Sequence, residues 1–198
     1  ENVFCATRPP GHHAEESTAM GFCFFNSAAI AAFHAKVSHK MERIAVVDFD
    51  VHHGNGTQHI LETDSKMFYA SSHQFPAYPG TGVSSEKGFF ENVVNVPLMP
   101  GSGSKEFRSA YVEQILPRLK LFMPEIIIIS AGFDAHVADP LAQLEVQTED
   151  YRWVTRELMK IAYEFAEGRI VSILEGGYNL NALRESTQVH IEALMEKS

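Results

Sequence analysis

Short apolar runs alternate with longer helical patterns along most of this chain, and that alternation limits the possible folds more than any other feature. The runs are rich in Val and Ile and lack the polar residue at every second position that a half-exposed sheet shows. Such strands, separated by helices, are typical of a parallel sheet covered on both faces. We therefore predict an α/β fold with strands at 44–48, 67–71, 93–96, 126–130 and 170–174 and helices at 26–38, 56–62, 105–122, 148–167 and 180–196.

The chain contains one predicted domain. Its 198 residues suit one substantial core and are few for two. No internal repeat, low-complexity tract or linker divides it, so we predict a single domain over 1–198. The long loop at 75–88 is rich in Gly and Pro, and loops of that length commonly carry function.

Composition argues against several classes of partner. The formal net charge of -9 speaks against nucleic acid, because a phosphate-binding surface needs clustered Lys and Arg. No apolar run approaches the roughly 20 residues that span a bilayer, and no signal peptide is visible, so we expect no membrane partner. Cys5 and Cys23 are too few for a disulfide framework, so we expect a reducing, cytoplasmic location.

Carboxylates and imidazoles gather where the predicted strand at 44–48 ends. Alternate residues of a strand face the same way, so Asp48, Asp50 and His52 project together. The ends of parallel strands are where α/β enzymes place their chemistry, and two carboxylates with an imidazole suit zinc or a similar divalent ion. The alternative interpretation is a strand end with solvated polar residues.

Two polar segments would lie beside this one. His12 and His13 follow a rigid Pro-Pro-Gly turn, and imidazoles suit general acid/base work near neutral pH, although a solvated surface loop is an equally good interpretation. Asp134 follows the strand of four isoleucines and offers a third carboxylate at the same edge of the sheet. An Asp in that position is also a common helix cap.

Two further segments have a structural and a functional interpretation. Tyr178 follows Glu-Gly-Gly at the end of the last predicted strand, where it is either a half-buried turn residue or a hydroxyl donor to a developing oxyanion. Gly21 opens an aromatic run before the helix at 26–38, which alone is more typical of core packing than of a substrate wall.

These five segments, in this order, resemble the zinc-dependent histone deacetylase family, with its acetylpolyamine amidohydrolase relatives and the bacterial deacetylase-like amidohydrolases. The resemblance runs from Arg8 to about Asn181. It implies the arginase/deacetylase fold, a parallel sheet with helices on both faces. It also implies a zinc-dependent amide hydrolase that removes an acetyl or related acyl group from lysine or a small amine.

The resemblance implies two metal sites. The zinc ligands would be Asp50, His52 and Asp134. A structural potassium would be bound around the backbone of Asp48 together with Ser71 and Ser72.

The resemblance also implies the acid/base groups. His13 would be the proton shuttle, His12 its electrostatic partner, and Asp48 the group that orients His12. Tyr178 would polarise the acyl carbonyl. Asn55 stands where class I members have an aspartate, which is class II-like and should leave His13 less biased toward the cation.

Four residues would contact the substrate. Gly21 would offer its carbonyl to the substrate amide, and Phe22 and Tyr78 would form the walls of the tunnel. Leu141 stands where polyamine-selective enzymes carry a glutamate, which favours an acyl-lysine protein or peptide, or a small acylated amine, over acetylpolyamines.

Length is the main departure from the family. The chain is shorter than the family's catalytic domains, and we expect it to lack the family's N-terminal strand, helices and rim loop before Arg8 and the material after its last helix. Apolar surface left by such segments would favour a homo-oligomer. A non-catalytic, zinc-bearing module that binds acyl-lysine or a partner is the alternative function, and a two-metal manganese hydrolase is a third that would need more carboxylates.

Overall fold

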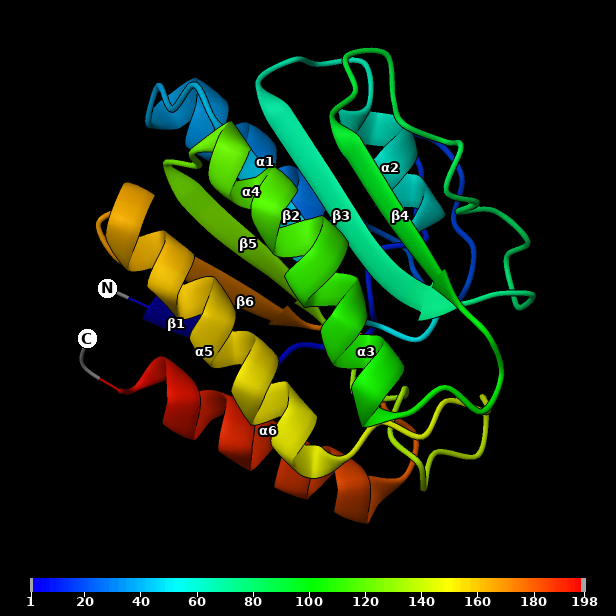
Figure 1. Cartoon of the computed structure of the whole chain (residues 1–198). Coiled ribbons are helices and arrows are strands. Elements are labelled where there is room, and N and C mark those ends of the chain that lie inside the picture. The colour runs from blue at the N-terminus through cyan, green and yellow to red at the C-terminus, as the bar shows by residue number, and fades with distance from the viewer. Residues whose placement is uncertain (1, 197–198) are drawn as a thin grey trace.

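The computed structural model describes residues 2–196 as one parallel sheet with helices on both faces (Figure 1). Its six strands lie in the order β1-β6-β5-β2-β3-β4, and every neighbouring pair is parallel. The strands are β1 (Asn2–Cys5), β2 (Ile44–Asp48), β3 (Met67–Gln74), β4 (Val93–Leu98), β5 (Ile126–Ala131) and β6 (Ile170–Leu174). The predicted α/β fold is confirmed.

Helices cover the sheet from both sides. They are α1 (Ser27–Ser38), α2 (Asn55–Leu61), α3 (Ser104–Ala110), α4 (Leu116–Phe122), α5 (Thr148–Phe165) and α6 (Leu180–Leu194). In Figure 1, α3, α4 and α5 lie in front of the sheet and α1 and α2 lie behind it, while α6 packs against α5. Within residues 2–196, no helix has the length and apolar character needed to cross a membrane.

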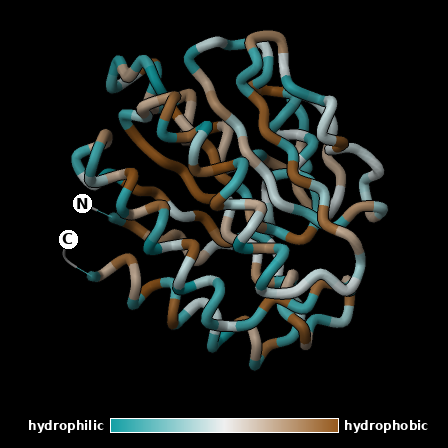
Figure 2. The backbone as a smooth tube through the Cα atoms, viewed as in Figure 1, coloured by the Kyte–Doolittle hydropathy of each residue, from teal (hydrophilic) through white to brown (hydrophobic). Residues whose placement is uncertain are grey.

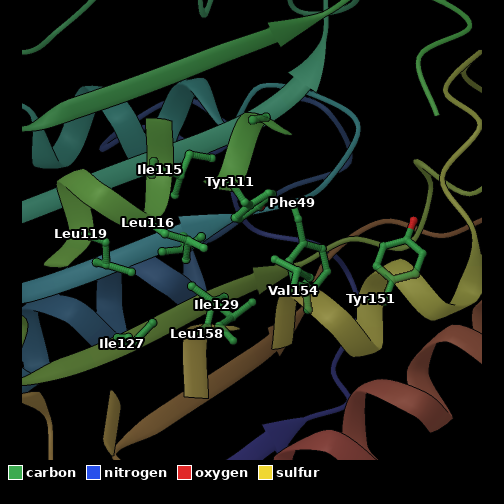
Figure 3. Packing of buried hydrophobic residues seen from close by; sticks show 14 of the residues in the cluster. Phe49, Tyr111, Ile115, Leu116, Leu119, Ile127, Ile129, Tyr151, Val154 and Leu158 are labelled. Carbon is green, nitrogen blue, oxygen red and sulfur yellow. The ribbon is translucent and has the colours of Figure 1, made fainter. Parts of the chain in front are cut away.

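Alternate residues of the central strands enter two separate cores. Val47 and Ile129 pack on the side of α3, α4 and α5, whereas Val46 and Ile128 pack on the side of α1. Figure 3 shows the first of these cores, in which Leu158 of α5 packs against β5. Because both faces are buried, β5 is hydrophobic at nearly every position (brown in Figure 2).

The strand β1 was not among the strands predicted from the sequence. It pairs with β6 at the edge of the sheet, with Asn2 opposite Ile170. Its four residues mix polar and apolar side chains, so they carry no periodic signal. Tertiary contacts define it instead: Asn2 Nδ2 donates to the carbonyl of Leu194 at 2.8 Å, which brings the two ends of the described chain side by side.

The helix predicted at 105–122 is continuous but irregular. Between α3 and α4 the chain forms a π-helical turn at Tyr111–Ile115. Pro117, in the first turn of α4, has no N–H to donate to the carbonyl four residues before it. The wider turn accommodates that missing hydrogen bond.

Candidate active site

The predicted site residues meet at the carboxyl ends of the central strands. β3 and β4 lie on one side of β2, and β5 and β6 lie on the other, so the direction of winding reverses beside β2. Crevices at such switch points are the usual ligand sites of α/β proteins. A cavity of about 390 Å³ opens there. Nine of the predicted residues line it together with Pro10, namely His12, His13, Gly21, Phe22, Asp50, His52, Tyr78, Leu141 and Tyr178.

Asp50, His52 and Asp134 are placed so that they could bind one metal ion. A donor atom from each lies within 4.8 Å of the others, and His52 Nδ1 is 3.1 Å from Asp50 Oδ1 and 3.3 Å from Asp134 Oδ2. Asp134 Oδ1 accepts a hydrogen bond from the N–H of Val51 at 2.9 Å. Its other oxygen is buried without a hydrogen-bond partner among the described residues. An unsatisfied carboxylate oxygen beside two other donor atoms fits a divalent cation such as zinc.

Two glycines let these carboxylates approach the backbone closely. A Cβ at Gly132 would lie 2.1 Å from Asp50 Oδ2, and a Cβ at Gly176 would lie 2.2 Å from Asp134 Oδ2. The N–H of Gly176 also donates to Asp50 Oδ2 at 2.8 Å. The turns after β5 and β6 therefore fit the two acids only because they carry no side chain at these positions.

The electrostatics of the three groups also favour a cation. Burial raises the pKa of Asp134 to about 6, and the negative charge of Asp50 contributes to the rise. Burial acts to lower the pKa of His52, but its close contacts with the two aspartates and their negative charges outweigh burial and raise that pKa to about 10. Buried carboxylates this close repel each other, and a bound divalent ion would stabilise both.

The tandem histidines differ in charge. Burial acts to lower the pKa of His12, but Asp48, which accepts from His12 Nδ1 at 2.9 Å, and Asp50 raise it well above its usual value. Burial and the adjacent charge of His12, whose ring lies 4.1 Å away, lower the pKa of His13 to about 3. His13 Nδ1 donates to Asn55 Oδ1 at 2.8 Å. Neutral His13 therefore keeps a free lone pair on Nε2, as a general base requires.

Aromatic and aliphatic side chains form the walls and rim of the cavity. The Phe22 ring lies 6.3 Å from the Tyr178 ring, and the Tyr78 ring lies 5.1 Å from the His13 ring. Burial raises the pKa of Tyr178, so its hydroxyl stays protonated and can donate. Leu141 is half exposed at the mouth. The cavity thus has an uncharged rim and a polar floor.

Gly21 and Phe22 are the central residues of a tight two-residue turn. Their φ angles are 55° and 66°, and Met20 and Cys23 exchange backbone hydrogen bonds on either side. This left-handed pair is the hairpin turn that matches strand twist, and it leaves Phe22 exposed at the rim. A Cβ at Gly21 would lie 2.2 Å from His13 Cδ2, so a glycine is required beside the base.

Two histidines that the sequence analysis did not assign hold the loop that carries Tyr78. A Cβ at Gly82 in this loop would lie 2.4 Å from His73 Nε2 and 2.6 Å from His53 Cγ. His73 Nε2 donates to the Gly82 carbonyl at 2.9 Å, and Thr81 Oγ1 is hydrogen-bonded to His53 Nδ1 at 2.8 Å. The sequence signal that could have identified His73 was the group of polar residues at the end of β3.

Glu175 is another residue that the sequence analysis did not assign. Its Oε2 accepts from the N–H groups of Gly11 at 2.6 Å and His12 at 3.1 Å, and its Oε1 accepts from Ser130 Oγ at 3.0 Å. This buried carboxylate ties the loop of the tandem histidines to the ends of β5 and β6. A carboxylate between a buried strand and two glycines was a signal that could have identified it.

The residues predicted to bind potassium are buried on neighbouring strands. Asp48 of β2 stands opposite Ser71 of β3. Ser71 Oγ is hydrogen-bonded to His73 Nδ1 at 2.9 Å, and Ser72 Oγ donates to Tyr111 Oη at 3.2 Å. Both hydroxyls thus have protein partners, and the potassium site stays a prediction.

Comparisons with known proteins find one matching family and several similar proteins. The histone deacetylase domain family matches residues 1–194. An uncharacterized protein of Synechocystis is 44% identical over 98% of this chain and 62% of its own length. Histone deacetylase 14, chloroplastic, of Arabidopsis thaliana is 46% identical over 97% of this chain and 46% of its own length. The histone deacetylase-like amidohydrolase of Pseudomonas aeruginosa is 41% identical over 90% of this chain and 48% of its own length.

A solved structure shows the same architecture. The crystal structure of the HDA15 HD domain matches with a TM-score of 0.92 and 41% identity, over 98% of this chain and 55% of that one. The fold is therefore the arginase/deacetylase fold, and the chain spans about half to three-fifths of the length of these relatives. A family match across nearly the whole sequence, together with relatives above 40% identity, shows that the chain belongs to the histone deacetylase family.

Proposed function

We propose that this protein is a zinc-dependent amide hydrolase that removes an acetyl or related acyl group from lysine or a small amine. The observation that carries the proposal is the meeting, at one cavity, of a three-residue donor set, a neutral histidine and a tyrosine hydroxyl. Hydrolysis of an unactivated amide needs an electrophilic activator, a base for water and a donor to the oxyanion.

Each group at the cavity has a separate role in this reaction. Bound to Asp50, His52 and Asp134, zinc would supply Lewis acidity to the acyl carbonyl and to the attacking water. His13 accepts the proton of that water on Nε2 and afterwards gives a proton to the departing amine. Tyr178 donates its hydroxyl proton in a hydrogen bond to the developing oxyanion.

His12 acts on the reaction through its charge. The Asp48 carboxylate keeps His12 protonated, and burial together with the positive His12 ring keeps His13 neutral. Glu175 fixes the backbone at Gly11 and His12, and hydrogen bonds to Asp48 and Asn55 orient the two rings before substrate binds.

The rim supports an acyl-lysine as the substrate. Phe22 and Tyr78 present aromatic surface on which the aliphatic stem of a lysine side chain can pack. Leu141 adds an uncharged side chain at the mouth, where a second amine of a polyamine would find no carboxylate from that position. The proposed substrate class is therefore an acyl-lysine protein or peptide, or a small acylated amine.

Turnover of acyl-lysine peptides tests the proposal. Zinc-loaded protein should hydrolyse acetyl-lysine and trifluoroacetyl-lysine fluorogenic peptides, and a hydroxamate inhibitor should abolish the signal. Gly103→Ala serves as the control variant, because its added Cβ would meet only ordinary contacts. Stoichiometric zinc without inhibitable turnover would contradict the proposal and favour the non-catalytic module that binds acyl-lysine or a partner.

Three properties of the protein stay predictions. We propose a cytoplasmic location because Cys5 and Cys23 are both free thiols. A homo-oligomer and a bound potassium are testable by sedimentation and by elemental analysis.

A further inference from the structure

Arg8 and Asp139 bind opposite ends of the peptide bond that precedes Tyr178. The Arg8 guanidinium donates to the carbonyl oxygen of Gly177 at 2.8 Å, and the N–H of Tyr178 donates to Asp139 Oδ2 at 2.8 Å. That carbonyl and that N–H belong to one planar peptide unit, so the two bonds together fix the orientation of the plane. We infer that Arg8 and Asp139 are positioning residues that hold the Tyr178 hydroxyl at the reacting carbonyl; the inference rests on the proposed function.

The backbone at this point has unusual freedom to turn. Two glycines precede Tyr178, and Gly177 has a φ of 129°, which residues with side chains rarely adopt. Rotation of the peptide plane between Gly177 and Tyr178 would move the phenol ring with it. Misplacing a reacting group by about 1 Å can cost on the order of 10²-fold in rate. The two hydrogen bonds therefore act where the backbone itself supplies little rigidity.

Asp139 joins the Tyr178 turn to the rim of the cavity. Its Oδ1 accepts from the N–H of Leu141 at 3.0 Å, and its Oδ2 also accepts from the N–H of Asn179 at 3.3 Å. The residue is buried, so its carboxylate is committed to these backbone groups. Three N–H groups from two loops thus meet on one side chain, and the Leu141 rim and the Tyr178 turn share a support.

Arg8 supports the same turn at the other end of the peptide unit, where it binds the carbonyl oxygen of Gly177. Its guanidinium lies 5.7 Å from the centroid of the Tyr178 ring, within reach of a cation–π contact. It belongs to the loop that leads into His12 and His13. The loop of the general base and the turn of the oxyanion donor are therefore connected through one side chain.

A double-mutant cycle separates positioning of Tyr178 from general support of the fold. We expect Asp139→Ala to lower kcat on the order of 10²-fold with little change in KM or zinc content. In a Tyr178→Phe background the same change should cost less than roughly threefold, because the hydroxyl that Asp139 positions is already gone. Arg8→Met should depend on Tyr178 in the same way. Equal losses of kcat in both backgrounds would overturn the inference.

Asp150 provides the matched control. It is also a buried carboxylate that accepts a backbone N–H, from Gln147 at 2.9 Å, but at the start of α5. Asp150→Ala should lower the free energy of unfolding without any coupling to Tyr178. Comparable coupling in Asp150→Ala would show that the cycle reports stability alone, and it would overturn the assignment.

A second measurement does not depend on turnover. With 3-fluorotyrosine at position 178, we expect the ¹⁹F resonance of the parent to shift or divide in Asp139→Asn and Asp139→Ala, because the acceptor for the Tyr178 N–H is altered or lost. An unchanged resonance would overturn the inference, and so would a changed resonance with unchanged kcat in an active protein. If the parent shows no turnover but the resonance changes, the positioning is supported and only the proposed function fails.

Discussion

Acid should destabilise this protein through His190, a residue of α6 whose side chain is buried in the core. Its Nδ1 is hydrogen-bonded to Thr155 Oγ1 at 2.6 Å and its Nε2 to Ser172 Oγ at 2.8 Å. Three phenylalanine rings surround it, and burial lowers its pKa to about 3. The folded protein therefore holds His190 neutral at every pH near neutrality.

The size of the effect follows from the difference in pKa between the two states. An unfolded histidine has a pKa of about 6.5, so below that pH the unfolded chain binds a proton at His190 that the folded chain refuses. The stabilisation by neutral His190 is complete above about pH 6.5 and is lost as the pH falls. Between pH 7 and pH 5 the free energy of unfolding falls by about 2 kcal/mol. The full slope of about 1.36 kcal/mol per pH unit applies only well below about pH 6.5, where the unfolded histidine is protonated.

Urea unfolding of the parent and of His190→Gln at pH 7 and pH 5 measures this contribution. Between the two pH values, the free energy of unfolding of the parent should fall by about 2 kcal/mol more than that of the variant. The comparison holds whatever the substitution itself costs in stability at pH 7. Other buried histidines, such as His53 and His73, titrate in both proteins and cancel in the comparison. Equal pH dependence in parent and variant would refute the reasoning.

Three further changes test the cavity. Tyr178→Phe should keep zinc but lower kcat by about 10²- to 10³-fold, the usual cost of one oxyanion donor, as steady-state kinetics would show. Asp134→Asn should weaken zinc by more than the roughly 10- to 100-fold typical of an outer-shell change, measured by chelator competition; undiminished affinity would remove it from the ligand set. Gly132→Ala should lower both zinc content and the unfolding temperature relative to Gly103→Ala, because its Cβ would lie 2.1 Å from Asp50 Oδ2.

The sequence predicts strands well where a strand is buried on both faces. β2 and β6 begin and end where we predicted, because each carries apolar residues almost throughout. β3 continues to Gln74 because its polar residues, His73 among them, are buried and hydrogen-bonded rather than solvated. The sequence does not reveal that difference, because the identity of a polar residue is the same whether its side chain is buried or solvated. β1 was missed for a related reason, as only its pairing with β6 defines it.

The predicted site residues share a strong local signal. Asp50 and Asp134 each follow a buried strand, and the tandem histidines follow a rigid turn, so these segments could be singled out from the sequence, while the roles predicted for them came from the resemblance to the deacetylase family. Asp139 gave no such signal, and the signal at Glu175, a carboxylate between a buried strand and two glycines, does not say what the residue contacts. Their importance lies in hydrogen bonds to backbone N–H groups far away along the chain, as between Glu175 and Gly11. Spacing in one sequence does not reveal contacts of that kind.

The contact between Asn2 and Leu194 has a consequence for how this fold can be connected. Asn2 stands at the amino end of β1, beside the start of β6, whereas the cavity lies at the carboxyl edge of the sheet. A short peptide could bridge this pair, and the chain could be opened at an exposed turn, with every strand pairing preserved. This pair of residues therefore lies away from the mouth of the cavity. The linear order of the segments is thus separable from the architecture that brings the predicted site residues together.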